Sequence, residues 1–411
     1  MNRSLARRIF GFSALPLLAA LVPLLALPVV SRIATTDEWA ALLVGQSVGA
    51  YASTVAYLGW NVLGTPRIAR IADEQTRREL YARSYFGRVA VLCLAAPVAM
   101  GISWWLVGAD SGWLAALFSL GSSLTSLGVA WYAVGVGTPS LIALYDLLPR
   151  VAVTAVAVIF VAVTGAPAYY AAATVFAPLI GVVLFNRRVS GRFIPRWPGL
   201  SVLRGDALRH RSAWGVEVVG NLYANAPTPV AAAVGTPISA AEYGSGDKVY
   251  RYGLLAVIAV SNAFQAWVLE TQGAVRVRRS VTSIIVMVAV GVSGGGFLIL
   301  FGEQLSRLLF GERHGSSAAT MLWLGIAYFC VSASTPFIRN LLIPGGLAFG
   351  VFVATIVCAV SGVATMIIGG AAVGAPGVAL GLAVSESLML VACVCMAFRT
   401  GLRGAKDVHL D

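Results

Sequence analysis

Residues 213–234 read AWGVEVVGNLYANAPTPVAAAV, and the interpretation of the whole chain starts from this stretch. At about 1.5 Å per residue, a helix of this length crosses a hydrocarbon core of roughly 30 Å. Glu217, Asn221 and Asn225 recur every four residues, so they lie along one face of that helix. Pro227 and Pro229 remove backbone donors and predict a kink or break after this polar face.

A carboxylate at membrane depth is costly and usually faces the interior of a bundle or a water-filled cavity. We therefore interpret 213–234 as a kinked helix that lines a cavity. The alternative is that its polar side chains only fix the packing of neighbouring helices.

The composition excludes an ordinary soluble domain. Of 411 residues, 58% are hydrophobic and only 11% are charged, against about 25% charged in soluble proteins. The net charge of +12 comes mostly from arginines between apolar blocks, a pattern that does not indicate nucleic-acid binding. The five cysteines lie inside apolar blocks without metal-ligand spacing. With no catalytic triad, phosphate-binding loop or carboxylate pair, the sequence predicts a protein that is not an enzyme and needs no metal.

Twelve apolar blocks predict an all-α multi-pass membrane protein with about 12 transmembrane helices. They lie at 9–30, 40–63, 89–107, 113–136, 151–163, 169–185, 213–234, 250–269, 282–301, 318–337, 348–368 and 377–398. The fifth block is short, and we expect its helix to begin earlier, within 140–148. We expect 65–88, with its mixed charges, to form a helix on the cytoplasmic surface.

The basic residues set the orientation of these helices. With both termini in the cytoplasm, all but five of the 29 Lys and Arg residues fall on the cytoplasmic side, as the positive-inside rule requires. The five exceptions are Arg32, Lys248, Arg251, Arg307 and Arg313.

The most basic loop, 186–212, divides the chain into an N-terminal six-helix lobe at 1–195 and a C-terminal one at 196–411. An offset of 204 residues carries Glu38 onto Glu242 and Pro23 onto Pro227. This match suggests that the lobes are parallel repeats about an axis along the membrane normal.

Three further stretches carry a resemblance to a known family. They are TDEWA at 36–40, TPRIAR at 65–70 and GTPSLIALYDLLPR at 137–150. With the basic N-terminus and the proline-containing first block, the chain resembles the polysaccharide repeat-unit (O-antigen type) flippases. That family belongs to the multidrug/oligosaccharidyl-lipid/polysaccharide exporter superfamily.

The resemblance implies a transporter of the bacterial cytoplasmic (inner) membrane, used in cell-surface polysaccharide biosynthesis. Such a flippase moves a polyprenyl-diphosphate-linked oligosaccharide from the cytoplasmic to the outer leaflet by alternating access between two six-helix lobes around a central cavity. The expected partners are this lipid-linked oligosaccharide and the bilayer, with a polysaccharide polymerase or glycosyltransferases as candidates. No nucleic acid is expected.

The candidate site residues follow from the chemistry of such a cargo. Sugars need amide, hydroxyl and aromatic partners, and a diphosphate needs guanidinium groups. The candidates for sugar binding are Asn221, Tyr223, Asn225, Gln46, Tyr51, Trp60, Asn61, Asn262, Gln265 and Trp267, and those for diphosphate binding are Arg32, Arg251 and Arg339. For each arginine the alternative is contact with lipid headgroups, and for each of the others it is packing between helices.

Glu217 and Glu386 are the candidates for coupling transport to an ion, either H⁺ or Na⁺, and no other cofactor is expected. Two functional alternatives remain open at this point. One is a multidrug cation antiporter of the same superfamily, and the other is a non-transporting membrane scaffold of polysaccharide assembly.

Overall fold

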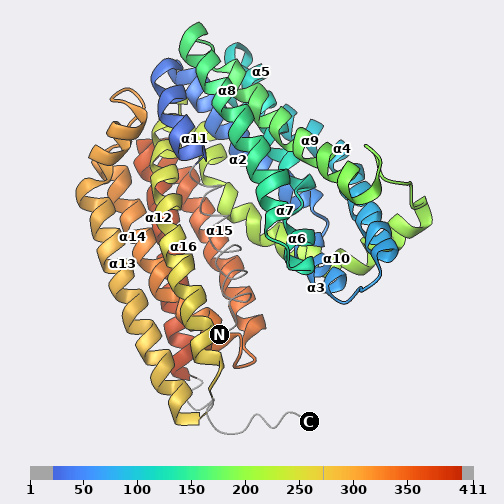
Figure 1. The fold of residues 1–411 in the computed structure, drawn as a ribbon. Coiled ribbons are helices and arrows are strands. Elements are labelled where there is room, and N and C mark those ends of the chain that lie inside the picture. The colour runs from blue at the N-terminus through green and yellow to red at the C-terminus, as the bar shows by residue number, and fades with distance from the viewer. Residues whose placement is uncertain (1–21, 272, 400–411) are drawn as a thin grey trace. The chain divides into compact units, whose positions relative to one another are not determined.

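The computed structural model describes residues 22–271 and 273–399, and its chain is divided into two compact units, Met1–Ala232 and Ala233–Asp411. The first unit consists of helices and short turns (Figure 1). They are the helix Val22–Ile33, α2 (Thr36–Ala56), α3 (Trp60–Ala69), α4 (Glu74–Val107), α5 (Ala109–Leu124), the 3-10 turn η1 (Thr125–Leu127), α6 (Ala130–Val136), α7 (Ser140–Ile142), the π-helical η2 (Ala143–Leu147), α8 (Leu148–Thr164), α9 (Ala168–Ser190) and α10 (Leu200–Asn225).

Helix α11 (Pro227–Val234) spans the division, and the second unit continues with long helices. They are α12 (Pro237–Leu269), α13 (Gly273–Phe310), α14 (Ala318–Pro336), the π-helical η3 (Phe337–Leu342), α15 (Ala348–Val373) and α16 (Ala375–Arg399).

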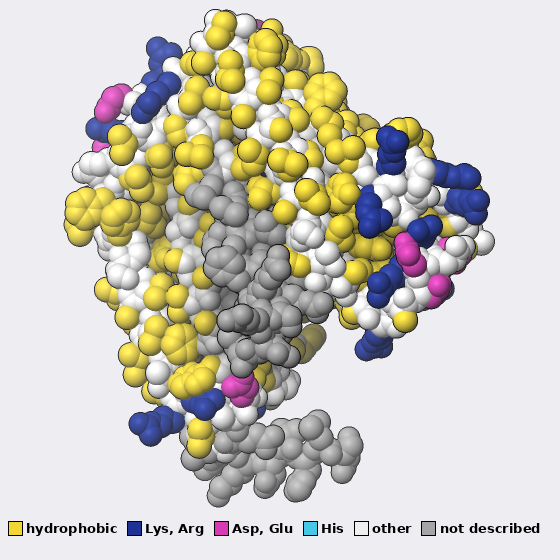
Figure 2. Space-filling view, in the orientation of Figure 1, with side chains coloured by type: hydrophobic (Ala, Val, Ile, Leu, Met, Phe, Trp, Pro, Cys, Tyr) yellow, Lys and Arg dark blue, Asp and Glu magenta, His cyan; other side chains and the backbone are white. Residues whose placement is uncertain are grey.

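The prediction of an all-α multi-pass membrane protein is confirmed. Within the described residues, nine helices are long and apolar enough to cross a membrane, or ten if the bent pair α2/α3 is one span. The helix Val22–Ile33 and the pair α10/α11 account for the two remaining expected blocks. Most of the first block lies in 1–21, outside the described residues. Hydrophobic side chains cover much of the visible face, as expected for helices in contact with lipid (Figure 2).

Four helices, α4, α10, α12 and α13, extend far beyond their apolar blocks, and there the predicted boundaries were wrong. Helix α4 begins at Glu74, so most of the expected surface helix is continuous with the third span. Helix α12 begins at Pro237 and includes Asp247, whose carboxylate is ion-paired with Arg251 at 2.6 Å one turn further on. The expected loop 186–212 is largely helical, since only residues 191–199 separate α9 from α10. The predicted earlier start of the fifth span is confirmed by the continuous stretch Ser140–Thr164.

The predicted second helix is broken. Its start is fixed by a capping box, in which the Thr35 hydroxyl accepts from the Glu38 amide and the Glu38 carboxylate accepts from the Thr35 amide. Helix α2 then ends at Ala56, and α3 leaves it at 46°. Leu58 and Gly59 both have positive φ, at 50° and 72°, a conformation that stops a right-handed helix.

Small residues let α2 pack closely on α5. A Cβ atom on Gly45 or Gly49 would collide with the backbone carbonyl of Ala115 or Ser119, respectively. The Ser53 hydroxyl also lies 3.0 Å from that of Thr125. Glycine at these positions therefore allows the backbones to approach, as is common between membrane helices.

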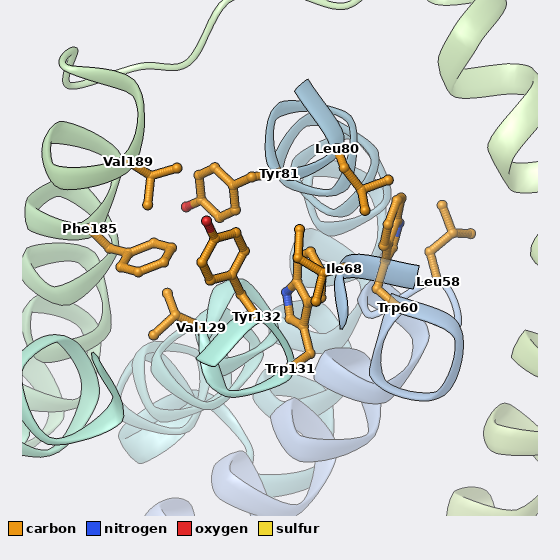
Figure 3. Close-up of a cluster of buried hydrophobic side chains, with 10 residues drawn as sticks. All are labelled: Leu58, Trp60, Ile68, Leu80, Tyr81, Val129, Trp131, Tyr132, Phe185 and Val189. Atoms are coloured by element: carbon orange, nitrogen blue, oxygen red, sulfur yellow. The ribbon is translucent and has the colours of Figure 1, made fainter. Parts of the chain in front are cut away.

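An aromatic cluster fills the core of the first unit beside this break (Figure 3). Tyr81, Tyr132 and Phe185 meet edge to face, with ring centroids 5.1–5.9 Å apart. Trp60 and Trp131 extend the cluster at 5.5 Å. Each such pair adds roughly 0.5–1.5 kcal/mol beyond the burial of its area, so the cluster stabilises the core of the first unit.

A buried arginine ties α4 to a second helix break. Arg88 is fully buried and donates to the carbonyls of Ser126 and Gly128 at 2.7 and 2.9 Å. These carbonyls lie where α5 gives way to η1 and α6, so the guanidinium satisfies acceptors that the break leaves open.

In the second unit a glutamate performs a similar capping task. The Glu242 carboxylate accepts from the Ser317 amide and hydroxyl at 3.2 and 2.5 Å and from the Thr320 hydroxyl at 2.8 Å, at the start of α14. Glu38 instead caps its own helix. The two glutamates that suggested the repeat thus have different partners, and both the repeat and the lobe boundary at 195/196 stay predictions.

Candidate functional site

The polar face predicted for 213–234 lies on one helix, α10. The Asn221 amide donates to the Glu217 carbonyl and the Asn225 amide to the Asn221 carbonyl, both at 2.9 Å. All three side chains are half-buried. Each side-chain amide donates an N–H to a backbone carbonyl of its own helix, so its side-chain oxygen stays available as an acceptor. The face therefore presents acceptors in a row on a single helix.

Glu217 begins this row. One of its carboxylate oxygens is buried and accepts no hydrogen bond from the described part of the chain. A buried acceptor of this kind is costly unless a proton, a cation or water meets it. The geometry therefore suits Glu217 to bind a small cation.

The predicted break after the polar face is confirmed. Helix α10 ends at Asn225, Ala226 is a bend, and α11 begins at Pro227. The reason is that proline cannot donate to the preceding turn. Thr228 and Ala231 of α11 are buried, so the chain continues as a packed segment after the break.

The first half of α10 is held against the first unit by polar contacts that hydropathy and motif spacing did not predict. The Trp214 indole donates to the Val55 carbonyl at 2.8 Å. His210 lies 3.0 Å from the Leu58 carbonyl and 2.7 Å from Arg67. One signal could have found this helix, namely Leu203, Ala207, His210 and Trp214 at spacings of four, three and four, which form one helical face.

An ion pair joins α10 to α4 on the same side. Arg83 donates twice to the Asp206 carboxylate, at 2.8 and 2.6 Å. The Asp206 side chain is only 3% exposed, whereas that of Arg83 is 29% exposed. Asp206 is the one acidic residue in the basic segment 186–212, and it faces inward.

The other candidates of the first unit do not share this face of α10. Trp60 is fully buried in the aromatic cluster, where its ring meets Trp131 and His210 (Figure 3). Asn61 is exposed on α3, Gln46 is half-buried on α2, and Arg32 is exposed at the end of the helix Val22–Ile33. On α10, Tyr223 is half-buried near the two asparagines.

The second unit brings Arg339 and α12 together. Arg339, in the π-helical η3, donates to the Ser261 hydroxyl at 3.1 Å, next to exposed Asn262 and one turn from half-buried Gln265. Single π turns inside α-helices are frequent at functional sites. Arg339 therefore contacts the turn of α12 that carries both amide candidates.

The structure gives three further candidates of the second unit, Arg251, Trp267 and Glu386, other surroundings. The candidate Arg251 donates to the Asp247 carboxylate at 2.6 Å, and this carboxylate compensates the charge of the arginine. Arg279 stacks on the ring of exposed Trp267, with the guanidinium 4.7 Å from the ring centroid. Glu386 is half-buried on α16.

None of these candidates lines the open pocket of about 530 Å³ in the first unit. Its lining is apolar and consists of Met100, Gly101, Trp104, Trp105, Trp113, Ala116 and Leu117 on α4 and α5. Exposed tryptophans at one end of membrane helices are typical of the interface between hydrocarbon and headgroups. We assign no substrate to this pocket.

The fold is similar to those of known membrane transporters. A structure described as the lipid II flippase MurJ in an inward closed conformation matches with a TM-score of 0.71 and 10% identity, over 94% of this chain and 87% of that one. An inward-facing multidrug resistance MATE family transporter of the MOP superfamily matches with a TM-score of 0.61 and 13% identity, over 97% and 96% of the two chains. A point mutant of the Vibrio cholerae MATE transporter VcmN matches with a TM-score of 0.53 and 16% identity over 98% of each chain.

Comparisons with protein-family models and with curated protein sequences found no match. At identities of 10–16%, the likeness to the solved structures is one of fold.

Proposed function

We propose that this protein flips a polyprenyl-diphosphate-linked oligosaccharide from the cytoplasmic to the outer leaflet of the bacterial inner membrane by alternating access. The observation that carries the proposal is the likeness in fold to the MurJ structure, described as a lipid II flippase, over nearly the whole chain. The resemblance of 36–40, 65–70 and 137–150 to polysaccharide repeat-unit flippases points to the same class of cargo.

The row of acceptors on α10 supports this assignment. A sugar head group needs directional hydrogen-bonding partners in a setting from which lipid is excluded. Asn221, Tyr223 and Asn225 offer such partners, and Arg339 offers a cation for the diphosphate on the turn of α12 that carries Asn262 and Gln265. Arg251 is a weaker candidate for the diphosphate, because Asp247 already compensates its charge.

Glu217 couples transport to an ion in this proposal. Its buried oxygen, which accepts no hydrogen bond from the described residues, fits binding of H⁺ or Na⁺, which would neutralise the carboxylate during one half of the transport cycle. Glu386 is the second candidate for this role.

The test is made in cells depleted of the protein. Isoprenoid-linked oligosaccharides on the cytoplasmic side are extracted and quantified by mass spectrometry. We expect one complete repeat unit to accumulate, and we expect the wild-type gene to reverse this accumulation. Glu217→Gln should fail to reverse it although the variant reaches wild-type abundance, whereas Glu79→Gln, at an exposed position, should restore transport.

Two results would contradict the proposal. Unchanged levels of lipid-linked oligosaccharide would remove the flippase function, and a simultaneous gain in sensitivity to cationic dyes would favour a multidrug antiporter. Full rescue by Glu217→Gln would remove this residue from the mechanism while leaving the cargo assignment intact.

A further inference from the structure

The break between α2 and α3 is closed by two side chains of α10. The end of a helix leaves carbonyl oxygens without partners inside the helix. Here the Trp214 indole donates to the Val55 carbonyl at 2.8 Å, and the His210 ring lies 3.0 Å from the Leu58 carbonyl. The two side chains are four residues apart, so they project from one face of α10. The break is therefore held in place by α10.

The contacts of His210 define its protonation state. Arg67 Nη1 lies 2.7 Å from His210 Nε2. A guanidinium group has only donors and keeps its charge in proteins, so Nε2 must be the acceptor. The single ring proton then sits on Nδ1, which donates to the Leu58 carbonyl. His210 is consequently neutral while this contact exists.

A second proton on His210 is incompatible with the contact to Arg67. It would place an N–H against an N–H at 2.7 Å and bring two cations together at a fully buried ring. Trp60 packs edge-on against that ring, with the centroids 4.8 Å apart, so the imidazole has little room to turn away. Protonation must therefore separate His210 from Arg67.

We propose that His210 is a proton-binding site that latches α10 to the break between α2 and α3. The neutral ring holds the two together, and the protonated ring weakens this docking of the first half of α10, which Trp214 and the Arg83–Asp206 pair still support. Because α10 also carries Glu217 and the two asparagines, the latch links a protonation event to the helix that bears the polar face. The proposal concerns how α10 is held and does not depend on the cargo.

The charged groups around His210 determine when the latch opens. Burial lowers the pKa of His210. The hydrogen bond to the Leu58 carbonyl raises this pKa, Arg67 lowers it, Asp206 raises it and Arg209 lowers it. Arg83 of α4 is paired with Asp206, which weakens the effect of that carboxylate.

The direction of the pH dependence follows from this lowered pKa. A released, hydrated histidine has a pKa of about 6.5. Between that value and the lower pKa of the latched ring, only the released form binds the extra proton. The latch is therefore fully closed above the pKa of the released form and weakens as the pH falls below it.

Hydrogen exchange measured by mass spectrometry tests the latch in the full chain in lipid nanodiscs. Exchange at pH 7.5 and 5.5, corrected for the intrinsic rate, is compared in segments 57–70 and 203–214. In the wild type we expect these segments to lose up to about tenfold of their protection at pH 5.5, the limit for one group whose released pKa is about 6.5. His210→Gln keeps a donor and an acceptor without titrating, so its protection should not change between the two pH values. His210→Arg carries a permanent charge and should exchange quickly at both.

The control is His314→Gln, which replaces another buried histidine in the second unit and should keep the wild-type response. Equal protection of the wild type at both pH values, or a wild-type response in His210→Gln, would overturn the proposal.

A second measurement covers the case in which His210→Gln fails to fold. Arg67→Gln removes the cation that opposes protonation, so the loss of protection between pH 7.5 and 5.5 should be smaller than in the wild type. In addition, ¹⁵N NMR of histidine-labelled wild-type protein should show His210 as the Nδ1–H tautomer at pH 7.5. An Nε2–H tautomer would contradict the latch.

Discussion

Replacing Arg83 by alanine should destabilise the packing of α10 on α4 far more than neutralising its ion-pair partner Asp206. The pair joins α4 to α10 through two hydrogen bonds of 2.8 and 2.6 Å. Its members differ in access to water, with Asp206 at 3% and Arg83 at 29% side-chain exposure. Arg83→Ala leaves the Asp206 carboxylate buried, charged and without its ion-pair partner. Asp206→Asn leaves a guanidinium that can turn to water.

The expected magnitudes follow from this asymmetry. Stranding one partner of a buried ion pair costs about 3–5 kcal/mol. Losing a hydrogen bond while the remaining group stays hydrated costs about 1–2 kcal/mol. Since 1.4 kcal/mol corresponds to a factor of ten in an equilibrium constant, Arg83→Ala should reduce the exchange protection of segment 203–211 by roughly a hundredfold or more. Asp206→Asn should reduce it by about tenfold.

The assay is hydrogen exchange of the nanodisc-embedded protein at pH 7.5. Arg78→Ala is the matched control, because Arg78 is on the same helix and pairs with Glu74 at an exposed site, where little change is expected. The double variant Arg83→Met/Asp206→Leu removes both charges and should recover most of the protection lost in Arg83→Ala. Our reasoning is refuted if Asp206→Asn harms the segment as much as Arg83→Ala, or if Arg83→Ala behaves like the control.

Two further substitutions probe the first unit, each read as a free energy of unfolding in a reversible SDS titration. Gly49→Ala should destabilise by about 1–3 kcal/mol because its Cβ meets the Ser119 carbonyl, whereas Gly101→Ala, with open space around it, should be neutral or stabilise by up to about 1 kcal/mol. Equal effects of the two would contradict the close approach of α2 and α5. Thr35→Ala should cost about 1 kcal/mol by removing the cap of α2, while Thr35→Ser should not, and an unaffected Thr35→Ala variant would argue against the capping box.

Hydropathy predicted the membrane helices well, because any long apolar segment must satisfy its backbone as a helix in lipid. It failed at helix ends, where charged residues are satisfied by partners distant in the sequence or one turn away. Asp247 pairs with Arg251 inside α12, and Glu242 caps α14, so neither interrupts the helix that carries it. A composition pattern contains no information on such pairing.

The polar face of α10 could be predicted because its spacing is local. The contacts of its first half could not, since they join residues more than a hundred positions apart. In the sequence alone, His210 falls in the expected loop 186–212 and Arg67 is one of many arginines expected on the cytoplasmic side. The bend after α2 was missed for the same reason, because Gly59 alone is a weak signal and the partners that stabilise the bend lie on α10.

The bend between α2 and α3 is completed by residues that the ribosome adds much later. Leu58 and Val55 precede His210 and Trp214 by 152 and 159 residues, respectively. At a translation rate of about 5–20 residues per second, roughly 8–30 s pass between synthesis of the two carbonyls and synthesis of their donors. A nascent chain that stops before α10 has an unfinished second helix, however many of its first six spans are already in the membrane. The bend of the first unit therefore gains its last partners only after α10 has been synthesised.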